Sequence, residues 1–239
     1  MNNLISDKFS PINSLKLFAL NEHFHNFVEL QKNQKLPKVI LLTGEKGIGK
    51  FTLIFHFINY VLSLNSKHPY DYENLLINKN NDSYKRILLH VEQNFNYIGS
   101  AKPNPATIEN IRDIKKSFYK SSLNNQPRFT VLDDVELMNA NAANALLKLI
   151  EEPSAYDYFV LINNKKQNMI ETLRSRSIEI KVFLKTEQKN KTFNHLKENF
   201  KIENNFLNNY LELTTPGMLI KFSDLFSTNK IDGEESFDN

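Results

Sequence analysis

A glycine-rich turn joins an apolar run to a helical segment, and this order constrains the fold more than any other feature of the chain. The stretch VILLTGEKGIGKFTL, residues 39–53, has Gly44, Gly49 and Lys50 at the spacing G-x-x-x-x-G-K, and Gly47 lies between them. Glycines let backbone N–H groups approach a phosphate closely, and the N-terminus of the following helix favours negative charge. The sequence therefore predicts a phosphate-binding loop, although a tight turn without a ligand has the same pattern.

The residue after the lysine departs from the pattern of nucleotide-hydrolysing loops. A hydroxyl is expected there to hold magnesium, and this chain has Phe51. Thr52 carries a hydroxyl, but one step along a helix turns a side chain by about 100° and moves it by about 1.5 Å. Thr52 is therefore no simple replacement, and the pattern leaves open whether the chain hydrolyses ATP.

Apolar runs alternate with amphipathic segments over most of the chain. We predict strands at residues 39–42, 86–91, 128–134, 158–164 and 177–183. We predict helices within residues 12–33, 51–64, 105–122 and 141–152, and a loop or insertion at 65–84. This alternation indicates an α/β fold, a five-stranded parallel sheet with helices on both faces.

Two acidic residues end the predicted strand at 128–134. Asp133 is where a magnesium-associated carboxylate is expected, and Asp134 is where many related ATPases have a Glu that activates water. Ligands of such sheets bind beyond the carboxyl ends of the strands, where the glycine-rich loop, Asp133 and Asn163 are expected to converge. Without the glycine-rich loop, the better interpretation would be that the two aspartates end a strand and have no functional role.

Two arginines precede the last predicted strand in the segment LRSRS, residues 173–177. A guanidinium at a protein surface can reach the γ-phosphate held by a neighbouring subunit and stabilise the transition state, an effect of about 10³ to 10⁵ in rate. For an isolated arginine, a surface salt bridge would be the better interpretation.

Length and patterning indicate one α/β domain and a smaller companion. The strand pattern stops after residue 184 of 239, so we predict an α/β domain at 1–184 and a small helical domain at 185–228. Residues 229–239 are polar and acidic, and we expect this tail to fray.

Composition excludes several classes of site. The chain has no Cys, so it forms neither disulfides nor a thiolate zinc site, and its six His lack metal-ligand spacing. No metal site is therefore predicted.

A net charge of +3 is weak support for direct nucleic-acid binding. There is no apolar run of about 18 residues and no signal-peptide pattern, so we expect a cytoplasmic protein without membrane contact.

Four segments together carry a family resemblance, which extends from about Pro37 to Phe222. They are GEKGIGK, VLDDVELMNANAANALLKLIEEPS, YFVLINNKKQNMIETLRSRS and LTTPGMLIKF. The chain resembles the AAA+ clamp-loader ATPases and is most similar to the delta-prime subunits of bacterial DNA polymerase III. The resemblance implies an AAA+ P-loop-type sheet followed by a helical lid domain.

The resemblance assigns roles to individual residues. The family's Ser-Arg-Cys motif, whose Arg acts in trans on an adjacent ATP site, matches the segment from Ser175 to Ser177, so Arg176 is the expected arginine finger. The sensor 1 residue is expected to be Asn163 or Asn164. Met218 stands where related subunits carry a sensor 2 Arg.

Three catalytic positions are thus altered, Phe51, Asp134 and Met218, while Arg176 is retained. This combination implies a subunit that does not hydrolyse ATP, requires no cofactor and offers Arg176 to a neighbour. Residual ATP binding at Gly44, Gly47, Gly49, Lys50, Thr52 and Asp133 stays open.

The implied partners are the gamma/tau ATPase subunits and the delta subunit, with the sliding clamp and primed DNA reached through the complex. The zinc module of many relatives cannot form in the Cys-free segment 67–84, and no collar domain is expected in this sequence. An active clamp-loader ATPase using Lys50, Thr52 and Asp133 remains the alternative from the enzyme class. A nucleic-acid-binding module is a third reading, which no basic, aromatic-interleaved face supports.

Overall fold

Five parallel strands form a single sheet in the order β2-β3-β4-β1-β5. The computed structural model describes residues 10–99, 107–120, 126–202, 210 and 212–229. The strands are β1 Val39–Thr43, β2 Phe95–Ile98, β3 Arg128–Asp133, β4 Asp157–Asn163 and β5 Ile178–Lys181. The predicted α/β fold with a five-stranded parallel sheet is confirmed.

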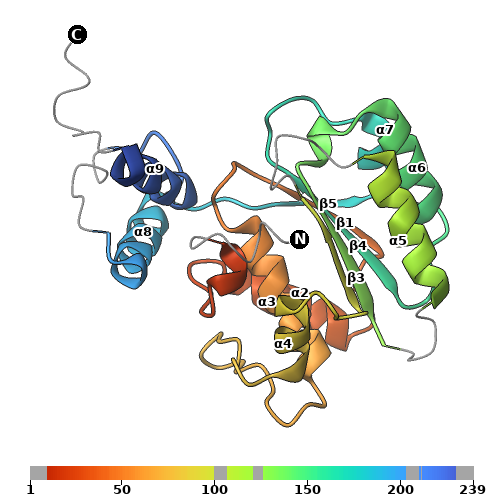
Figure 1. Ribbon diagram of the computed structural model, residues 1–239, viewed down its shortest axis with the longest axis horizontal. Helices are drawn as coiled ribbons and strands as arrows, with labels where there is room; N and C mark the ends of the chain where they lie inside the picture. Colours follow the sequence, from red (N-terminus) through yellow and green to blue (C-terminus); the bar gives the residue numbers. More distant parts are fainter. Residues whose placement is uncertain (1–9, 100–106, 121–125, 203–209, 211, 230–239) are drawn as a thin grey trace.

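Helices cover both faces of the sheet (Figure 1). One face carries α2 Asn21–Lys32, α3 Lys50–Ser63 and α4 Asp82–Leu88, and the other carries α5 Ile108–Lys120, α6 Ala140–Ile150 and α7 Glu171–Arg174. Side chains alternate between these layers along β1. Ile40 and Leu42 pack with the first layer, and Val39 and Leu41 with the second. A strand covered on both faces needs a continuous apolar run, which explains the pattern of β1.

Local capping fixes where the helices around the sheet begin. The predicted helices after the glycine-rich loop and after β3 are confirmed as α3 and α6. Asn139 caps α6, since its Oδ1 accepts a hydrogen bond from Ala142 N at 2.8 Å. This bond satisfies an amide that lacks a partner in the first helical turn.

The predicted strand at residues 86–91 is wrong. Residues Asp82–Leu88 form α4 instead, and the chain then turns through His90, whose φ is 59°. The Asn81 side chain accepts from Tyr84 N and starts this helix. A short apolar run cannot distinguish a buried strand from a helix, and the real second strand, β2, was missed because Asn96 interrupts its apolar pattern.

The helix predicted at residues 12–33 is confirmed only in its second half, as α2. Residues Pro11–Asn13 form a short 3₁₀ helix, η1, and the segment after it is not helical and forms an isolated antiparallel bridge between Lys16 and Leu76. Leu17 N donates to Leu75 O at 3.0 Å, and Ile77 N donates to Leu15 O at 2.8 Å. The predicted insertion therefore pairs with this N-terminal segment, a long-range contact that local periodicity does not reveal.

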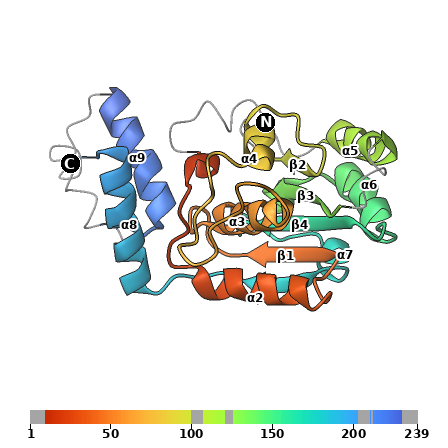
Figure 2. The same ribbon diagram turned by 90° about the horizontal axis from the view of Figure 1, so that it is seen from below.

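Two further helices, α8 Thr186–Phe200 and α9 Pro216–Asn229, pack on each other around Phe193, Leu219 and Ile220. Figure 2 shows the arrow of β1 pointing towards this pair, with α7 at the opposite end of the strand. The helical pair thus stands beyond the carboxyl ends of the strands. The predicted domain division near residue 184 stays a prediction, and the predicted tail lies almost wholly outside the described residues.

Candidate functional site

The glycine-rich loop and the acidic pair meet at the carboxyl edge of the sheet. Thr43, the last residue of β1, pairs with Asn163, and Asp133 pairs with Ile162 one strand further. A cavity of about 200 Å³ opens here between the loop, the N-terminal segment and the helical pair. Ligand pockets for small molecules usually measure about 300–1,000 Å³. The glycine-rich loop and Asp133 thus meet at one comparatively small cavity, whose lining includes Asn164 and not the expected Asn163.

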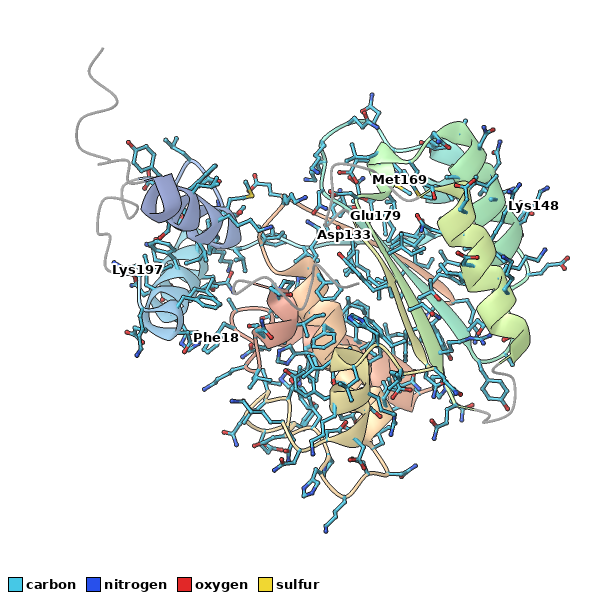
Figure 3. The ribbon with its side chains drawn as sticks, in the orientation of Figure 1. Phe18, Asp133, Lys148, Met169, Glu179 and Lys197 are labelled. Carbon is cyan, nitrogen blue, oxygen red and sulfur yellow. The ribbon has the colours of Figure 1, made fainter. Side chains whose placement is uncertain are left out.

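Three parts of the chain line this cavity. Figure 3 labels Asp133 at the sheet and Phe18 beside α8. The lining includes Pro11, Lys16, Leu17, Phe18, Lys46, Gly47, Gly49, Lys50, Phe51, Thr52, Asp133, Asn164, Leu196, Gly217, Met218 and Lys221. The structure thus brings most of the predicted loop residues to one wall.

The helical pair is seated directly on the glycine-rich loop. Gly217 N donates to Gly47 O at 3.0 Å, and Thr215 Oγ1 donates to Lys46 O at 2.6 Å. A Cβ atom on Gly47, whose φ is 85°, would lie 2.4 Å from Thr215 Oγ1. Only glycine meets both requirements, the positive φ and the close approach.

Gly44 is held in a similar way by a neighbouring chain segment. A Cβ atom there would lie 2.3 Å from the carbonyl oxygen of Val182, directly after β5. Two of the loop's three glycines therefore have a packing reason that involves no phosphate. This observation favours the alternative interpretation of the loop as a tight turn.

Lys50 is turned inwards onto its own loop. Its Nζ donates to Gly44 O and to Glu45 O, both at 2.7 Å, and the residue is only 3% exposed. Burial lowers the pKa of Lys50 from 10.5 to about 8, against the opposing effect of the nearby carboxylates, Asp133 first among them. The ammonium thus binds backbone carbonyls at the place where a phosphate would need it.

The lowered pKa of Lys50 predicts a pH dependence of stability. The unfolded chain keeps this proton up to about pH 10.5 and the native chain releases it near pH 8, so the unfolded state binds more protons in this window and native stability rises with pH. Between pH 7.5 and 10 we expect wild type to gain about 2 kcal/mol relative to Lys50→Met. Urea unfolding of both proteins at the two pH values measures the gain, and a pH-independent difference would contradict it.

Asp134 is fully buried and is held by two lysines from different loops. Lys46 Nζ lies 3.1 Å from Oδ2, and Lys166 Nζ lies 2.9 Å from Oδ1. Burial alone would lower the pKa of Lys166, but the hydrogen bond to Asp134 and the charge of that carboxylate raise it. The predicted water-activating position is therefore occupied by internal ion pairs.

Asp133 faces Asn164 and Tyr97. Its Oδ1 accepts from Asn164 Nδ2 at 2.8 Å, and its Oδ2 accepts from the Tyr97 hydroxyl at 3.5 Å. Burial raises the pKa of Asp133, and the charge of Asp134 raises it further, whereas the hydrogen bond from Asn164 lowers it. Both oxygens of the predicted metal-associated carboxylate thus have protein partners.

The two candidate sensor residues lie in different surroundings. Asn164 Nδ2 bridges the acidic pair, since it also donates to Asp134 Oδ1 at 2.7 Å. Asn163 Oδ1 accepts from Lys165 N at 2.7 Å, and its amide points to the Met169 sulfur at 4.0 Å. The structure therefore brings Asn164, rather than Asn163, to the acidic pair.

Phe51 fills the space beside Lys50 with aromatic packing. Its ring lies 4.8 Å from that of Tyr97 in an edge-on arrangement and 5.7 Å from that of Phe55 in a stacked one. Thr52 and Met218 line the cavity nearby. The aromatic contact joins α3 to β2, so Phe51 has a structural role in this position.

Sequence reasoning missed four residues of this site. Lys46, Lys166 and Tyr97 contact the acidic pair as described above, and Glu136 is a further buried carboxylate, whose Oε1 accepts from Asn164 N at 3.1 Å. Lys46 and Lys166 lie in segments that were interpreted for their glycines and asparagines. The sequence signal for their role was that both segments are expected to lie beside the acidic pair.

Arg176 lies at the opposite edge of the sheet. It lies two residues before β5. The first residue of β5, Ile178, pairs with Ile40 near the start of β1, whereas the glycine-rich loop follows the end of β1. Four strand residues span about 13 Å. The arginine is exposed and its Nε lies 3.0 Å from Glu151 Oε1, so its own glycine-rich loop is out of reach.

Comparison with known proteins identifies the family of this chain. The family model described as DNA polymerase III, delta subunit, matches residues 20–186. The DNA polymerase III subunit delta' of Buchnera aphidicola subsp. Schizaphis graminum is 26% identical over 181 residues, which are 76% of this chain and 53% of that relative. The subunit gamma of the same organism is 27% identical over 168 residues, 68% of this chain and 42% of that relative.

This chain spans about half the length of the delta' relatives that it matches over most of its own length. Among solved structures, a DNA polymerase III gamma subunit-related protein of Thermotoga maritima is similar, with a TM-score of 0.47 and 19% identity. The alignment covers 87% of this chain and 64% of that one. Within the described ranges, no helix combines the length and the apolar character that crossing a bilayer requires.

The family match covers the sheet, the glycine-rich loop, the acidic pair and Arg176, and the delta' relatives match most of the chain. The chain therefore belongs to the delta-prime clamp-loader family of DNA polymerase III.

Proposed function

We propose that this chain is a non-hydrolysing subunit of a DNA polymerase III clamp loader, which helps to load the sliding clamp onto primed DNA. It does so by offering Arg176 to ATP bound on a neighbouring ATPase subunit. The observation that carries the proposal is the contrast between the two edges of the sheet. Arg176 is exposed at one edge, while Lys50 and Asp134 at the other are buried among internal partners.

Arg176 can leave its present contacts at little cost. Its ion pair with Glu151 joins side chains that are 41% and 46% exposed, and its NH1 donates to Thr172 O at 3.2 Å. Exposed pairs of this kind contribute about 0–1 kcal/mol. A γ-phosphate on an adjacent subunit, with its higher charge, would compete well with a single carboxylate.

The chain's own site supports the same proposal. Hydrolysis needs a lysine on the phosphates, a hydroxyl and a carboxylate for magnesium, and a residue that positions water. Here Lys50 binds loop carbonyls, Phe51 packs on Tyr97, and Asp134 is paired with two lysines. No cofactor is required for the proposed role, and any ATP that the small cavity still takes would be bound without turnover.

The proposed partners are gamma/tau ATPase subunits and the delta subunit, with the sliding clamp and primed DNA reached through the assembled complex in the cytoplasm. The relatives named delta' and gamma are subunits of DNA polymerase III. A second candidate function, an active clamp-loader ATPase, is favoured by one observation, since Lys50, Thr52 and Asp133 all line the cavity.

Reconstitution tests the proposal against this second candidate. We expect the chain, mixed with gamma and delta subunits of its own organism, to elute with them as one complex from a size-exclusion column. The isolated chain should show ATP turnover at the background rate of a buffer control. Failure to join the complex would contradict the proposed function, and turnover that disappears in Lys50→Ala would establish the ATPase instead.

A further inference from the structure

The acidic pair at the carboxyl edge of the sheet is surrounded by the protein's own cations and hydrogen-bond donors. Asp134 is fully buried, and Lys46 and Lys166 contact its two oxygens at 3.1 Å and 2.9 Å. Asn164 Nδ2 donates to one oxygen of each aspartate. A buried carboxylate without such partners would be costly, so these contacts explain how Asp134 is accommodated.

The two lysines reach Asp134 from separate loops. Lys46 belongs to the glycine-rich loop, and Lys166 follows β4. Their side chains are 35% and 36% exposed, so each extends from the surface to a carboxylate that water does not reach. The pair of contacts therefore links the two loops through one buried charge.

The family's glycine-rich loop and acidic strand end imply a magnesium ion at this place, and the residues present do not fit one. Magnesium needs oxygen ligands in near-ideal octahedral geometry. Both oxygens of Asp133, the expected metal ligand, already accept hydrogen bonds, from Asn164 and Tyr97. Both oxygens of Asp134 contact ammonium groups, and Phe51 replaces the ligand hydroxyl. The part of the chain that the structure describes contains no group of three or more Asp, Glu, His or Cys side chains arranged to hold a metal.

We propose that Lys46 and Lys166 are built-in counter-ions that replace a divalent metal at Asp133 and Asp134. The two ammonium groups supply positive charge to the acidic pair through their contacts with both oxygens of Asp134, and they repel a metal ion from this carboxylate. This inference does not rest on the role of Arg176, and it concerns the isolated chain.

The test measures Mn²⁺ binding, with Mn²⁺ as a paramagnetic probe for a magnesium site. Electron paramagnetic resonance of free Mn²⁺ measures the binding. Any Mn²⁺ binding by wild type should be unchanged in Asp134→Asn. The Lys46→Met/Lys166→Met variant should gain one Mn²⁺ site. Its dissociation constant should be about 1 mM, as in weak sites for hard cations, and at least about tenfold lower than that of any wild-type binding. Adding Asp134→Asn to this variant should abolish the gain.

A charge-matched control separates the specific site from a general loss of positive charge. Lys16→Met/Lys221→Met removes two lysines that line the same cavity, and it should leave Mn²⁺ binding as in wild type. If Lys46→Met/Lys166→Met does not fold alone, Mn²⁺ should raise the melting temperature of Lys166→Met but not that of wild type. Wild-type binding that depends on Asp134, or no gain in either lysine variant, would overturn the proposal.

Discussion

Replacing Arg176 with Ala should slow ATP hydrolysis on the neighbouring subunit by about 10³-fold or more, the range measured for arginines that act in trans. The arginine is exposed at the edge of the sheet away from the chain's own glycine-rich loop. Its loss would leave transition-state charge on the neighbour's phosphate uncompensated. Single-turnover experiments on the assembled loader, with primed DNA present, measure the hydrolysis rate at the neighbour's ATP site before the other ATP sites go through repeated cycles.

Arg174→Ala is the matched control for this variant. Arg174 also lies in the segment before β5, carries the same charge, and pairs with Glu179 at 3.1 Å. We expect hydrolysis close to the wild-type rate, and complex formation should be unchanged in both variants. Equal slowing by the two substitutions would indicate a general electrostatic effect and would remove the specific role of Arg176.

Replacing Phe51 with Thr should destabilise the protein by about 3 kcal/mol without producing an ATPase. Phe51 is 7% exposed and packs on Tyr97 and Phe55. Loss of a buried Phe side chain usually costs about 3–5 kcal/mol, of which Thr recovers a small part. The new hydroxyl should not restore turnover, because Asp134 remains paired with Lys46 and Lys166. Urea unfolding and a phosphate-release assay measure the two effects.

Phe55→Thr provides the comparison, since Phe55 lies one helical turn further on α3 and is fully buried. It should cost similar stability and place no hydroxyl beside Lys50. Phosphate release by Phe51→Thr above the level of Phe55→Thr would show that the lack of a hydroxyl at position 51 is by itself what prevents ATP hydrolysis. In that case the internal pairing of Asp134 would not be what prevents hydrolysis.

The sheet could be predicted because its signals are local and strong. β1, β3 and β4 are apolar runs buried on both faces, and the glycine-rich loop marks the edge where they end. Parallel pairing then places Asp133 at the same edge without knowledge of any tertiary contact. Arg176, in contrast, was singled out by the family resemblance of the segment before the last strand and not by strand pairing.

The errors arose where long-range contacts decide the local structure. The N-terminal segment looks helical by spacing, yet its Leu15 and Leu17 pair with the distant segment 75–77. The apolar run after Arg86 lies in and after a helix that Asn81 caps. Within the site, Lys46 and Lys166 act through ion pairs across 88 and 32 positions of sequence separation, which no periodicity encodes.

The most direct test of the account compares Lys50→Met with Arg176→Ala in the same reconstituted loader. The central claim is that this chain contributes to hydrolysis through Arg176 and not through its own glycine-rich loop. We predict a DNA-stimulated ATPase rate that is unchanged by Lys50→Met and strongly reduced by Arg176→Ala, with both variants present in the complex at wild-type stoichiometry. A reduced rate with Lys50→Met and an unchanged rate with Arg176→Ala would contradict the account.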